Sequence, residues 1–187
     1  DLVLLQLEIP LAVNRAVARW AKAAGVPVML NPAPATELDD ELLSLVTWLI
    51  PNEQEASTET HLPLRTEAGE LVEDDLRNIA ASLWDKGVTH TVITLGGHGS
   101  VVVEAERLRY IPCVTMPHVA DPTAAGDSFV GALAVGVTLG LPYARALEFA
   151  SHTAAITVSR MGAMPSFPTL DEVVALMRER DYQVFDL

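Results

Sequence analysis

The stretch Leu2-Val3-Leu4-Leu5-Gln6-Leu7 opens a strand, helix and strand unit that extends to residue 30 and decides the class of fold. Its nearly continuous apolar character is typical of a strand that is buried on both faces of a parallel sheet. Residues 10–24 carry apolar side chains at helical spacing and end before Gly25, which can adopt a left-handed C-cap conformation. Residues 26–30 form the next apolar strand, so we expect two parallel strands joined by a crossover helix.

The same alternation of strands and helices continues along the chain. Further strands are predicted over residues 47–50 and 88–95. Further helices are predicted over residues 38–46, 68–86, 124–140, 142–160 and 170–180. Residues 58–66 have mixed polarity and are expected to form a surface loop, whereas segments 100–104 and 108–113 predict an antiparallel hairpin at the sheet edge. The pattern as a whole predicts an α/β fold with a mostly parallel sheet and helices on both faces.

Composition and charge narrow the possible classes of function. Half of the 187 residues are hydrophobic, which favours a globular domain over disorder. A net charge of -13 without a dense Lys/Arg cluster argues against nucleic acid as a partner. No apolar run approaches the roughly 20 residues of a membrane span and no signal peptide is evident, so we expect a cytoplasmic protein without a membrane partner. The single Cys113 excludes an intrachain disulfide and is expected to be a small core residue.

Polar residues and glycines follow the predicted strands. Glu8, Asn31, Asn52 and the segment Gly96–Gly99 each come directly after a strand. Right-handed crossovers place the carboxyl ends of parallel strands at one edge of the sheet, which is where ligands bind in open α/β folds. Asn52 and Glu55 suit a hydrated Mg²⁺ that bridges phosphates, although helix capping by Asn52 explains the same residues. The glycine turn can approach a phosphate closely, but it lacks both the G-x-G-x-x-G spacing and the lysine of a Walker loop.

The segment Asp121-Pro122-Thr123-Ala124-Ala125-Gly126-Asp127-Ser128-Phe129 leads into the helix expected from about residue 124. The small side chains of Ala124, Ala125 and Gly126 leave backbone N–H groups accessible at a positively polarised helix N-terminus, which predicts an anion hole. Asp127 is placed beside it to accept a proton from a hydroxyl group while a phosphoryl group is transferred. The competing interpretation is that Asp127 simply favours the first turn of a helix, as acidic residues do.

Taken in order, these segments resemble the carboxyl-terminal portion of the ribokinase-type (PfkB-type) carbohydrate kinases. The matching segments are Gln6-Leu7-Glu8, Asn31-Pro32-Ala33-Pro34, Pro51-Asn52-Glu53-Gln54-Glu55-Ala56, Ile93-Thr94-Leu95-Gly96, Asp121 to Asp127 and Gly162-Ala163-Met164-Pro165-Ser166. The resemblance covers nearly all of the chain and implies one partial kinase domain, residues 1–187, in a three-layer α/β/α sandwich. It also implies ATP-dependent transfer of a phosphoryl group to the terminal hydroxyl of a pentose, with D-ribose as the first expectation.

The resemblance assigns a role to each matching residue. Asp127 would be the catalytic base, Ala124 to Gly126 the anion hole, and Glu8 a contact to the sugar. The residues on the ATP side would be Asn31, Asn52, Thr94, Gly96, Gly99 and His152. Mg²⁺ would be organised by Asn52 and Glu55. A monovalent cation, usually K⁺, would be held by Asp121, Thr123, Thr157, Arg160, Gly162 and Ser166, several of them through backbone carbonyls. From its position alone, His152 is equally well explained as a partly buried structural histidine.

Two departures from the family pattern are visible. Pro122 stands where members commonly carry Thr, so a hydroxyl contact is lost although proline tolerates the local backbone. The amino-terminal strands, the small β-sheet lid and a Gly-Gly loop that grips the sugar are expected to be absent. We therefore expect this chain to phosphorylate sugar poorly, if at all, by itself. The resemblance also allows a homodimer for the full-length family member.

Three alternatives stay open on the sequence. The first is a kinase of the same family that acts on another sugar or on a nucleoside. The second is a truncated nucleotide-binding module without catalysis. The third, a dinucleotide-binding oxidoreductase, is disfavoured because the first strand-to-helix turn, Glu8-Ile9-Pro10, contains no glycine.

Overall fold

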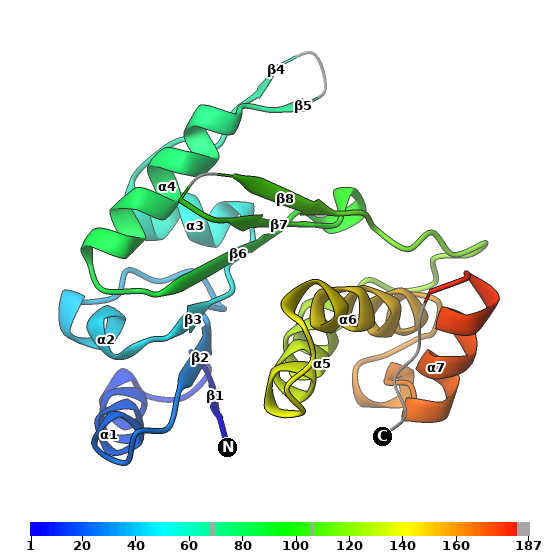
Figure 1. Cartoon of the computed structure of the whole chain (residues 1–187), viewed down its shortest axis with the longest axis horizontal. Helices are drawn as coiled ribbons and strands as arrows, with labels where there is room; N and C mark the ends of the chain where they lie inside the picture. Colours follow the sequence, from blue (N-terminus) through cyan, green and yellow to red (C-terminus); the bar gives the residue numbers. More distant parts are fainter. Residues whose placement is uncertain (68–69, 106, 183–187) are drawn as a thin grey trace. The chain divides into compact units, whose positions relative to one another are not determined.

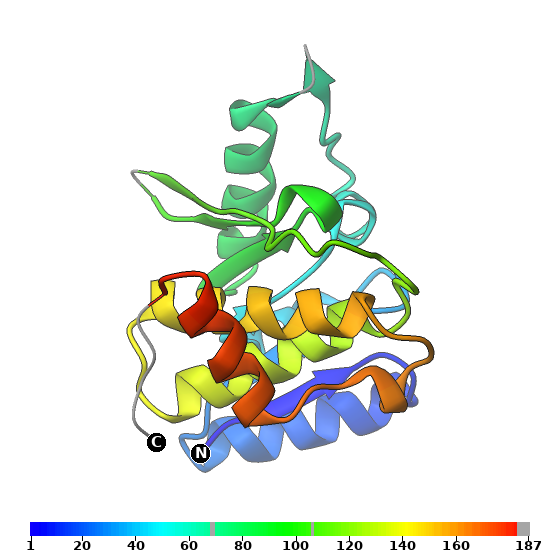
Figure 2. The ribbon, with the colours of Figure 1, turned by 90° about the vertical axis from the view of Figure 1, so that its right-hand side faces the viewer.

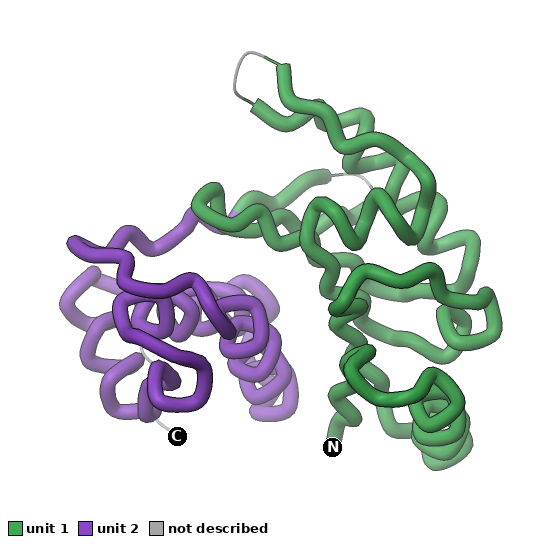
Figure 3. Tube along the Cα trace, turned by 180° about the vertical axis from the view of Figure 1, so that it is seen from behind, with its two compact units in different colours: residues 1–110 green, residues 111–187 purple. Residues whose placement is uncertain are grey.

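The computed structural model of the chain describes residues 1–67, 70–105 and 107–182 (Figure 1). The chain divides into two compact units, residues 1–110 and residues 111–187, which Figure 3 colours green and purple. The first unit contains nearly all of the main sheet with its crossover helices, and the second is helical.

The main sheet has the strand order β1-β2-β3-β6-β7-β8. Its strands are β1 (Val3–Gln6), β2 (Val28–Asn31), β3 (Trp48–Leu49), β6 (His90–Thr94), β7 (Ser100–Val103) and β8 (Leu108–Ile111). The first four run parallel, whereas β7 is antiparallel to β6 and β8 pairs beside it at the sheet edge. The predicted mostly parallel sheet with an edge hairpin is confirmed.

The helices of the first unit pack through one apolar core. They are α1 (Leu11–Ala23), α2 (Asp40–Leu45), α3 (Glu53–Thr60) and α4 (Glu73–Asp85). The strand register aligns Leu5 with Leu30 and Leu30 with Leu49, which places these side chains in one row. The row is buried in the same cluster as Ala18 of α1 and Leu83 of α4, and Figure 1 shows α1, α2 and α4 on one side of the strands. Burial of this face is what holds the strand ends in a fixed order.

Strand β1 departs from the expected burial on both faces. Leu5 is 8% exposed and joins the core, whereas Leu4, which points to the opposite face, is 43% exposed. The expectation is therefore wrong for β1, because in the described part of the chain only the face that carries Leu5 is covered by the core, and the face that carries Leu4 is not. It is correct for β2, where the neighbouring residues Met29 and Leu30 are both fully buried.

Helix α4 begins later than predicted. The predicted start near residue 68 is wrong, because Leu71 lies in β5 (Glu70–Leu71) and pairs with Thr66 of β4 (Thr66–Glu67). Residues 68 and 69 lie outside the described part. Asp75 then accepts hydrogen bonds from the backbone and the guanidinium of Arg65 at 2.7 to 2.9 Å, so the hairpin is tied to the first helical turn. Acidic residues in that turn favour the start of a helix there.

The predicted surface loop at residues 58–66 is also partly wrong. Residues 58–60 form the last turn of α3, and Glu59 and Thr60 are buried. The helix ends at His61, whose φ of 55° is left-handed. Cys113, expected in the core, is exposed, because β8 ends at Ile111 and the chain continues as an irregular segment. In the part of the chain that the structure describes, no helix is long and apolar enough to cross a bilayer.

The second unit contains α5 (Ala125–Thr138), α6 (Tyr143–Val158) and α7 (Leu170–Glu179), close to their predicted bounds. A short 3₁₀ turn (Met164–Ser166) lies in the predicted loop between α6 and α7. Helices α5 and α6 pack side by side (Figure 2). They approach closely at Gly136, where an added Cβ would lie 2.8 Å from the Cβ of Ala146. A glycine at this position, near the C-terminal end of α5, lets the two helices meet without steric overlap.

Replacing Gly136 with Ala should destabilise the protein by about 1–3 kcal/mol, because the extra methyl group overpacks the contact between α5 and α6. The measurement is the free energy of unfolding in urea. Gly131→Ala in the same helix is the matched control, since a Cβ there meets no atom within 4 Å. It should leave stability unchanged or raise it by up to about 1 kcal/mol. Equal losses in both variants would contradict the packing argument.

Candidate active site

The N-terminus of α5 begins from a left-handed residue. Ala124 has φ 61° and ψ 11°, an uncommon conformation for a residue with a side chain. Its carbonyl accepts a hydrogen bond from the N–H of Ser128 at 2.9 Å, which starts the helix. Strained backbone of this kind is concentrated at functional sites, because the surrounding structure must hold it in place.

The first helical turn of α5 presents unpaired backbone donors. Within the described residues, the N–H groups of Gly126 and Asp127 meet no acceptor, whereas the N–H of Ala125 donates to the carbonyl of Pro122 at 3.2 Å. The predicted anion hole therefore has Gly126 among its available donors, but the N–H of Ala125 is already engaged. The N–H of Asp127 itself is a donor that the sequence argument missed. Unpaired N–H groups at a helix N-terminus favour a bound anion.

Asp127 lies in this first turn with its side chain exposed to solvent. The neighbouring Ser128 is buried and donates its hydroxyl to the carbonyl of Ala125 at 2.9 Å. The helix thus turns Ser128 inward and Asp127 outward. A carboxylate beside open backbone donors can accept a proton from a hydroxyl group that is attacking a phosphoryl group.

Asp121 fastens the segment before α5 to the loop after α6. One carboxylate oxygen accepts from the N–H of Thr123 and the other from the N–H of Gly162, each at 2.9 Å. Hydrogen bonds from Thr123 and then from Gly162 hold the pKa of the Asp121 carboxyl below its usual 3.8. The backbone N–H of Asp121 also donates to the carbonyl of Val158 at 3.2 Å. The structure thus brings together two of the segments predicted to share a monovalent cation.

The other predicted cation ligands lie in the last turn of α6 and in the segment that follows it, up to the 3₁₀ turn. Thr157 and Ser166 are fully buried, and the Ser166 hydroxyl donates to the carbonyl of Ala163 at 2.5 Å. The guanidinium of Arg160 turns away to Glu172, with Nη2 2.5 Å from Oε1. Arg160 is therefore left with its carbonyl as a possible cation ligand. Carboxylate, hydroxyl and carbonyl oxygens are the donors that hard cations prefer, so these residues fit a K⁺ ion.

His152 lies inside the second unit. It is fully buried, its Nδ1 lies 2.7 Å from the carbonyl of Glu148, and its ring meets the Tyr182 ring edge-on with centroids 4.5 Å apart. Burial lowers the pKa of His152. Because a carbonyl only accepts, Nδ1 carries the proton, and Nε2 has no hydrogen-bond partner within the described residues. The alternative of a buried structural histidine describes this geometry, in which the ring presents no atom to solvent.

Residues of the first unit meet at the carboxyl ends of the parallel strands, as predicted. Asn31 ends β2 and donates its side-chain amide to the carbonyl of Ile50 at 2.9 Å. Asn52, just after β3, forms a parallel bridge with Thr94 at the end of β6. Glu8 follows β1 and is exposed. Neighbouring parallel strands therefore place Asn31, Asn52 and Thr94 along one edge of the sheet.

Asn52 and Glu55 form a complete capping box at the start of α3. The Asn52 side chain accepts from the N–H of Glu55 at 2.8 Å, and the Glu55 carboxylate accepts from the backbone N–H and side-chain amide of Asn52 at 2.8 and 2.9 Å. Glu55 is 6% exposed. The geometry therefore shows helix capping by Asn52, the alternative given above. The reciprocal hydrogen bonds hold Asn52 and Glu55 in one arrangement. Each Glu55 carboxylate oxygen accepts one hydrogen bond from Asn52, so a metal contact, direct or through water, would share this carboxylate with Asn52.

The glycine turn after β6 exposes its backbone. Gly96 and Gly99 have left-handed φ values of 52° and 92°, and the N–H of Leu95 donates to the carbonyl of Gly99 at 2.8 Å. A Cβ at Gly96 or Gly97 would meet no atom within 4 Å. The turn thus leaves open space beside its main chain, which is what the close approach of a phosphate requires.

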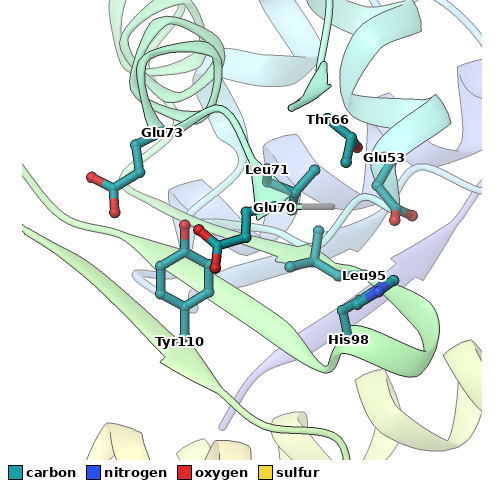
Figure 4. Close-up of a pocket in the computed structure, with 8 residues that line it drawn as sticks. All are labelled: Glu53, Thr66, Glu70, Leu71, Glu73, Leu95, His98 and Tyr110. Carbon is teal, nitrogen blue, oxygen red and sulfur yellow. The ribbon is translucent and has the colours of Figure 1, made fainter. Parts of the chain in front are cut away.

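A cavity of about 440 Å³ in the first unit was not anticipated from the sequence (Figure 4). It is lined by Glu53, Thr66, Glu70, Leu71, Glu73, Leu95, His98 and Tyr110. Burial and then the charges of Glu73 and Glu70 raise the pKa of Tyr110. Three carboxylates disfavour a triphosphate in this cavity, so it does not replace the strand-end residues as the candidate nucleotide site. Sequence patterns do not predict this cavity, because its walls come from α3, the β4–β5 hairpin, α4, the glycine turn and β8, which come together only in the folded chain.

The described residues contain no group of three or more His, Cys, Asp or Glu side chains suited to a metal ion. A Mg²⁺ ion usually needs no such cage, since it keeps several waters and binds one or two carboxylates together with substrate phosphates. The residues near Asn52 are compatible with that mode, in which the nucleotide supplies part of the coordination.

Polar strand ends and an open glycine turn in the first unit, and a helix N-terminus with unpaired donors in the second unit, are features with which α/β proteins bind phosphate groups. The family model described as pfkB family carbohydrate kinase matches residues 2–170, and the chain belongs to this family. Ribokinase of Haemophilus influenzae is 38% identical over 178 residues, which cover 95% of this chain and 56% of that protein. The bifunctional ribokinase/ribose-5-phosphate isomerase A of Fructilactobacillus sanfranciscensis is 36% identical over 180 residues, which cover 96% of this chain and 32% of the relative.

Solved structures give the same answer for the fold. The structure of Arabidopsis thaliana ribokinase complexed with ribose and ATP aligns with a TM-score of 0.87 at 34% identity, over 95% of this chain and 55% of that chain. The predicted ribokinase-like α/β fold is therefore confirmed. The chain spans between about a third and about half of the length of these relatives.

Proposed function

We propose that this chain is the nucleotide-binding and catalytic part of an ATP-dependent sugar kinase that phosphorylates the terminal hydroxyl of a pentose. The observation that carries the proposal is the exposed Asp127 beside the unpaired N–H groups of Gly126 and Asp127. Asp127 accepts the proton of the sugar hydroxyl, and the oxygen attacks the γ-phosphorus. The bond from that phosphorus to the bridging oxygen of ADP breaks, and the helix N-terminus stabilises the negative charge on the transferring group.

D-Ribose is the proposed substrate, with ribose 5-phosphate as product. Support comes from the relatives named ribokinase and from the Arabidopsis thaliana structure, which holds ribose and ATP. In this proposal Glu8 contacts the sugar, while Asn31, Asn52, Thr94, Gly96 and Gly99 lie toward the nucleotide. His152, whose ring is fully buried within the second unit, would support the adenosine side through packing and would not contact the nucleotide itself.

Two metal ions complete the proposal. Mg²⁺ would neutralise phosphate charge near Asn52 and Glu55, and the capping box would fix the geometry of that end of the site. K⁺ would be held by oxygens of Asp121, Thr123, Thr157, Arg160, Gly162 and Ser166. Its positive charge would lie between the segment that leads into α5 and the segment that leaves α6. There it would support the anion hole.

The test measures ADP release in the presence of ribose, other sugars or nucleosides, with and without K⁺. Calorimetry measures ATP binding by the same protein. Ribose-dependent ADP release that K⁺ increases is the expected result. Because the relatives are longer, the assay is repeated with the amino-terminal portion of the Haemophilus influenzae ribokinase fused before residue 1. ATP binding without ADP release in either form would favour a non-catalytic nucleotide-binding module. A nucleoside as the preferred acceptor would replace ribose in the proposal.

A further inference from the structure

A buried ionic clasp lies at the far end of α3 from the Asn52–Glu55 box. We define the clasp as the Glu59 carboxylate, the Lys86 ammonium and the backbone N–H of Leu38. The N–H of Leu38 donates to Glu59 Oε2 at 2.9 Å, and Lys86 Nζ donates to Oε1 at 3.2 Å. Lys86 Nζ also reaches the main-chain carbonyl of Glu59 at 3.3 Å. The clasp therefore joins three segments that are distant in sequence.

Each joined segment has a defined place in the fold. Leu38 immediately precedes Asp39, the N-cap of α2, and Lys86 is the C-cap of α4. Other charges surround the clasp. Asp40 lies 3.9 Å from Lys86 Nζ, and Glu37 lies near Glu59 and 3.6 Å from His61. Asp40, Glu37 and His61 are all well exposed, whereas the Glu59 side chain is 1% exposed.

Burying a carboxylate removes its charge from water, which opposes folding. A short helix is therefore fixed in this way only where it has few apolar side chains that could pack instead. Burial raises the pKa of Glu59, although Leu38 and Lys86 oppose that rise. Helix α3 has the sequence EQEASTET, in which Ala56 is the sole apolar residue. Ala56 is buried in the core, but one methyl group gives little resistance to sliding or rotation of the helix. The hydrogen bonds of the clasp supply the directional restraint that apolar packing does not.

We propose that Glu59 is a positioning residue for the nucleotide site, because its clasp fixes α3 and with it the Asn52–Glu55 pair one to two helical turns away. This inference rests on the proposed function, in which that pair organises Mg²⁺ and phosphates. In this proposal Glu59 itself contacts neither Mg²⁺ nor the phosphates. It acts through the rigid helix, in the way that outer hydrogen-bond partners orient the residues that contact a metal.

The test compares Glu59→Gln, Lys86→Met and the double variant, with Asp40→Asn as the matched control. Asp40 also faces Lys86, but its side chain is 82% exposed. The readouts are the Kd of Mg·ATP, kcat normalised to the folded fraction, and hydrogen exchange of the Asn52 amide. Glu59→Gln should weaken Mg·ATP binding by about 10-fold or more, with a smaller change in kcat and faster exchange at Asn52. Lys86→Met should lower Tm most, because it leaves the Glu59 charge buried without its partner, and the double variant should recover part of that loss. Asp40→Asn should behave like the unmodified chain.

Two outcomes would overturn the proposal, and they are distinguishable. If Glu59→Gln lowers Tm but leaves both the Kd of Mg·ATP and the exchange of Asn52 unchanged, Glu59 stabilises the fold without positioning the site. If the unmodified chain and its fusion bind no ATP, the proposed function fails and the positioning role fails with it. Weaker Mg·ATP binding confined to Glu59 and Lys86 variants would support the clasp.

Discussion

Replacing Asp127 with Asn should lower the rate of phosphoryl transfer by about 10²- to 10⁴-fold, because an amide cannot accept the proton of the attacking hydroxyl. ATP binding should be retained, since the variant keeps the backbone N–H groups of Gly126 and residue 127. The fold should also be retained, because Asp127 is exposed and its side chain makes no hydrogen bond within the described residues. Single-turnover measurements of ADP release would follow the rate, and calorimetry would follow ATP.

The matched control for this prediction is Asp171→Asn. Asp171 is also an exposed aspartate in the first turn of a helix of the second unit, at the start of α7. A loss of stability that comes from removing a negative charge from the first turn of a helix should appear in both variants, whereas a loss of phosphoryl transfer should appear in Asp127→Asn alone. If Asp127→Asn turned over as fast as the Asp171 variant, the assignment of the base would be wrong. An unchanged rate with weaker ATP binding would point instead to an electrostatic role.

Much of the first unit could be predicted from local sequence because its strands are short apolar runs and its crossover helices are amphipathic. The rule that parallel strands share their carboxyl edge predicts that Asn31, Asn52 and the glycine turn lie along one edge, and the structure adds Thr94, which bridges to Asn52 there. The start of α4 could not be predicted in this way. Leu71 fits a helical pattern, but it pairs with Thr66 in a hairpin that has no alternation of its own.

The last turn of α3 was missed for a related physical reason. With Ala56 as its sole apolar residue, the helix has almost no hydrophobic periodicity, and its stability comes from a capping box at one end and Glu59 at the other. Such interactions depend on partners that tertiary folding supplies, in this case Leu38 and Lys86. The burial of His152 against Tyr182 also depends on tertiary folding. The sequence predicts that His152 lies on a helix, but it does not predict which face of the helix carries it.

The candidate base, by contrast, was readable from the sequence around it. Small residues before Asp127 indicated an open helix N-terminus, and the structure adds the left-handed Ala124 and the engaged N–H of Ala125. The link from Asp121 to Gly162 spans 41 residues and could be anticipated only through the family resemblance, which grouped both residues around a cation. That link leads to the second large effect.

Replacing Asp121 with Asn should uncouple the segment before α5 from the loop after α6, which are the two segments proposed to bind K⁺. Turnover should then fall by about 10-fold or more, with loss of K⁺ stimulation. Both carboxylate oxygens accept a backbone N–H in the native chain, from Thr123 and from Gly162. Asparagine offers one acceptor and one donor group, so one of the two N–H groups must face another donor. The measurement is the K⁺ dependence of ribose-dependent ADP release, with Asp74→Asn, an exposed aspartate of the first unit, as the control.

The Asp121→Asn substitution should also change how the stability of the protein depends on pH in the acid range. The folded-state pKa of Asp121 lies below its usual 3.8, so the stability that its carboxylate contributes is present above that value and is lost as the pH falls through the folded pKa. The thermal midpoint of the native chain should therefore fall more steeply on acidification in that range than the midpoint of Asp121→Asn, which has no carboxylate to protonate. Parallel acid profiles combined with intact K⁺ stimulation would show that the hydrogen bonds to Thr123 and Gly162 do not hold the loops together. Two results together would support the proposed cation site: a thermal midpoint that falls more steeply with acidification in the native chain, and K⁺ stimulation that Asp121→Asn lacks. They would place the cation beside the segment that leads into α5, the helix that carries the proposed base.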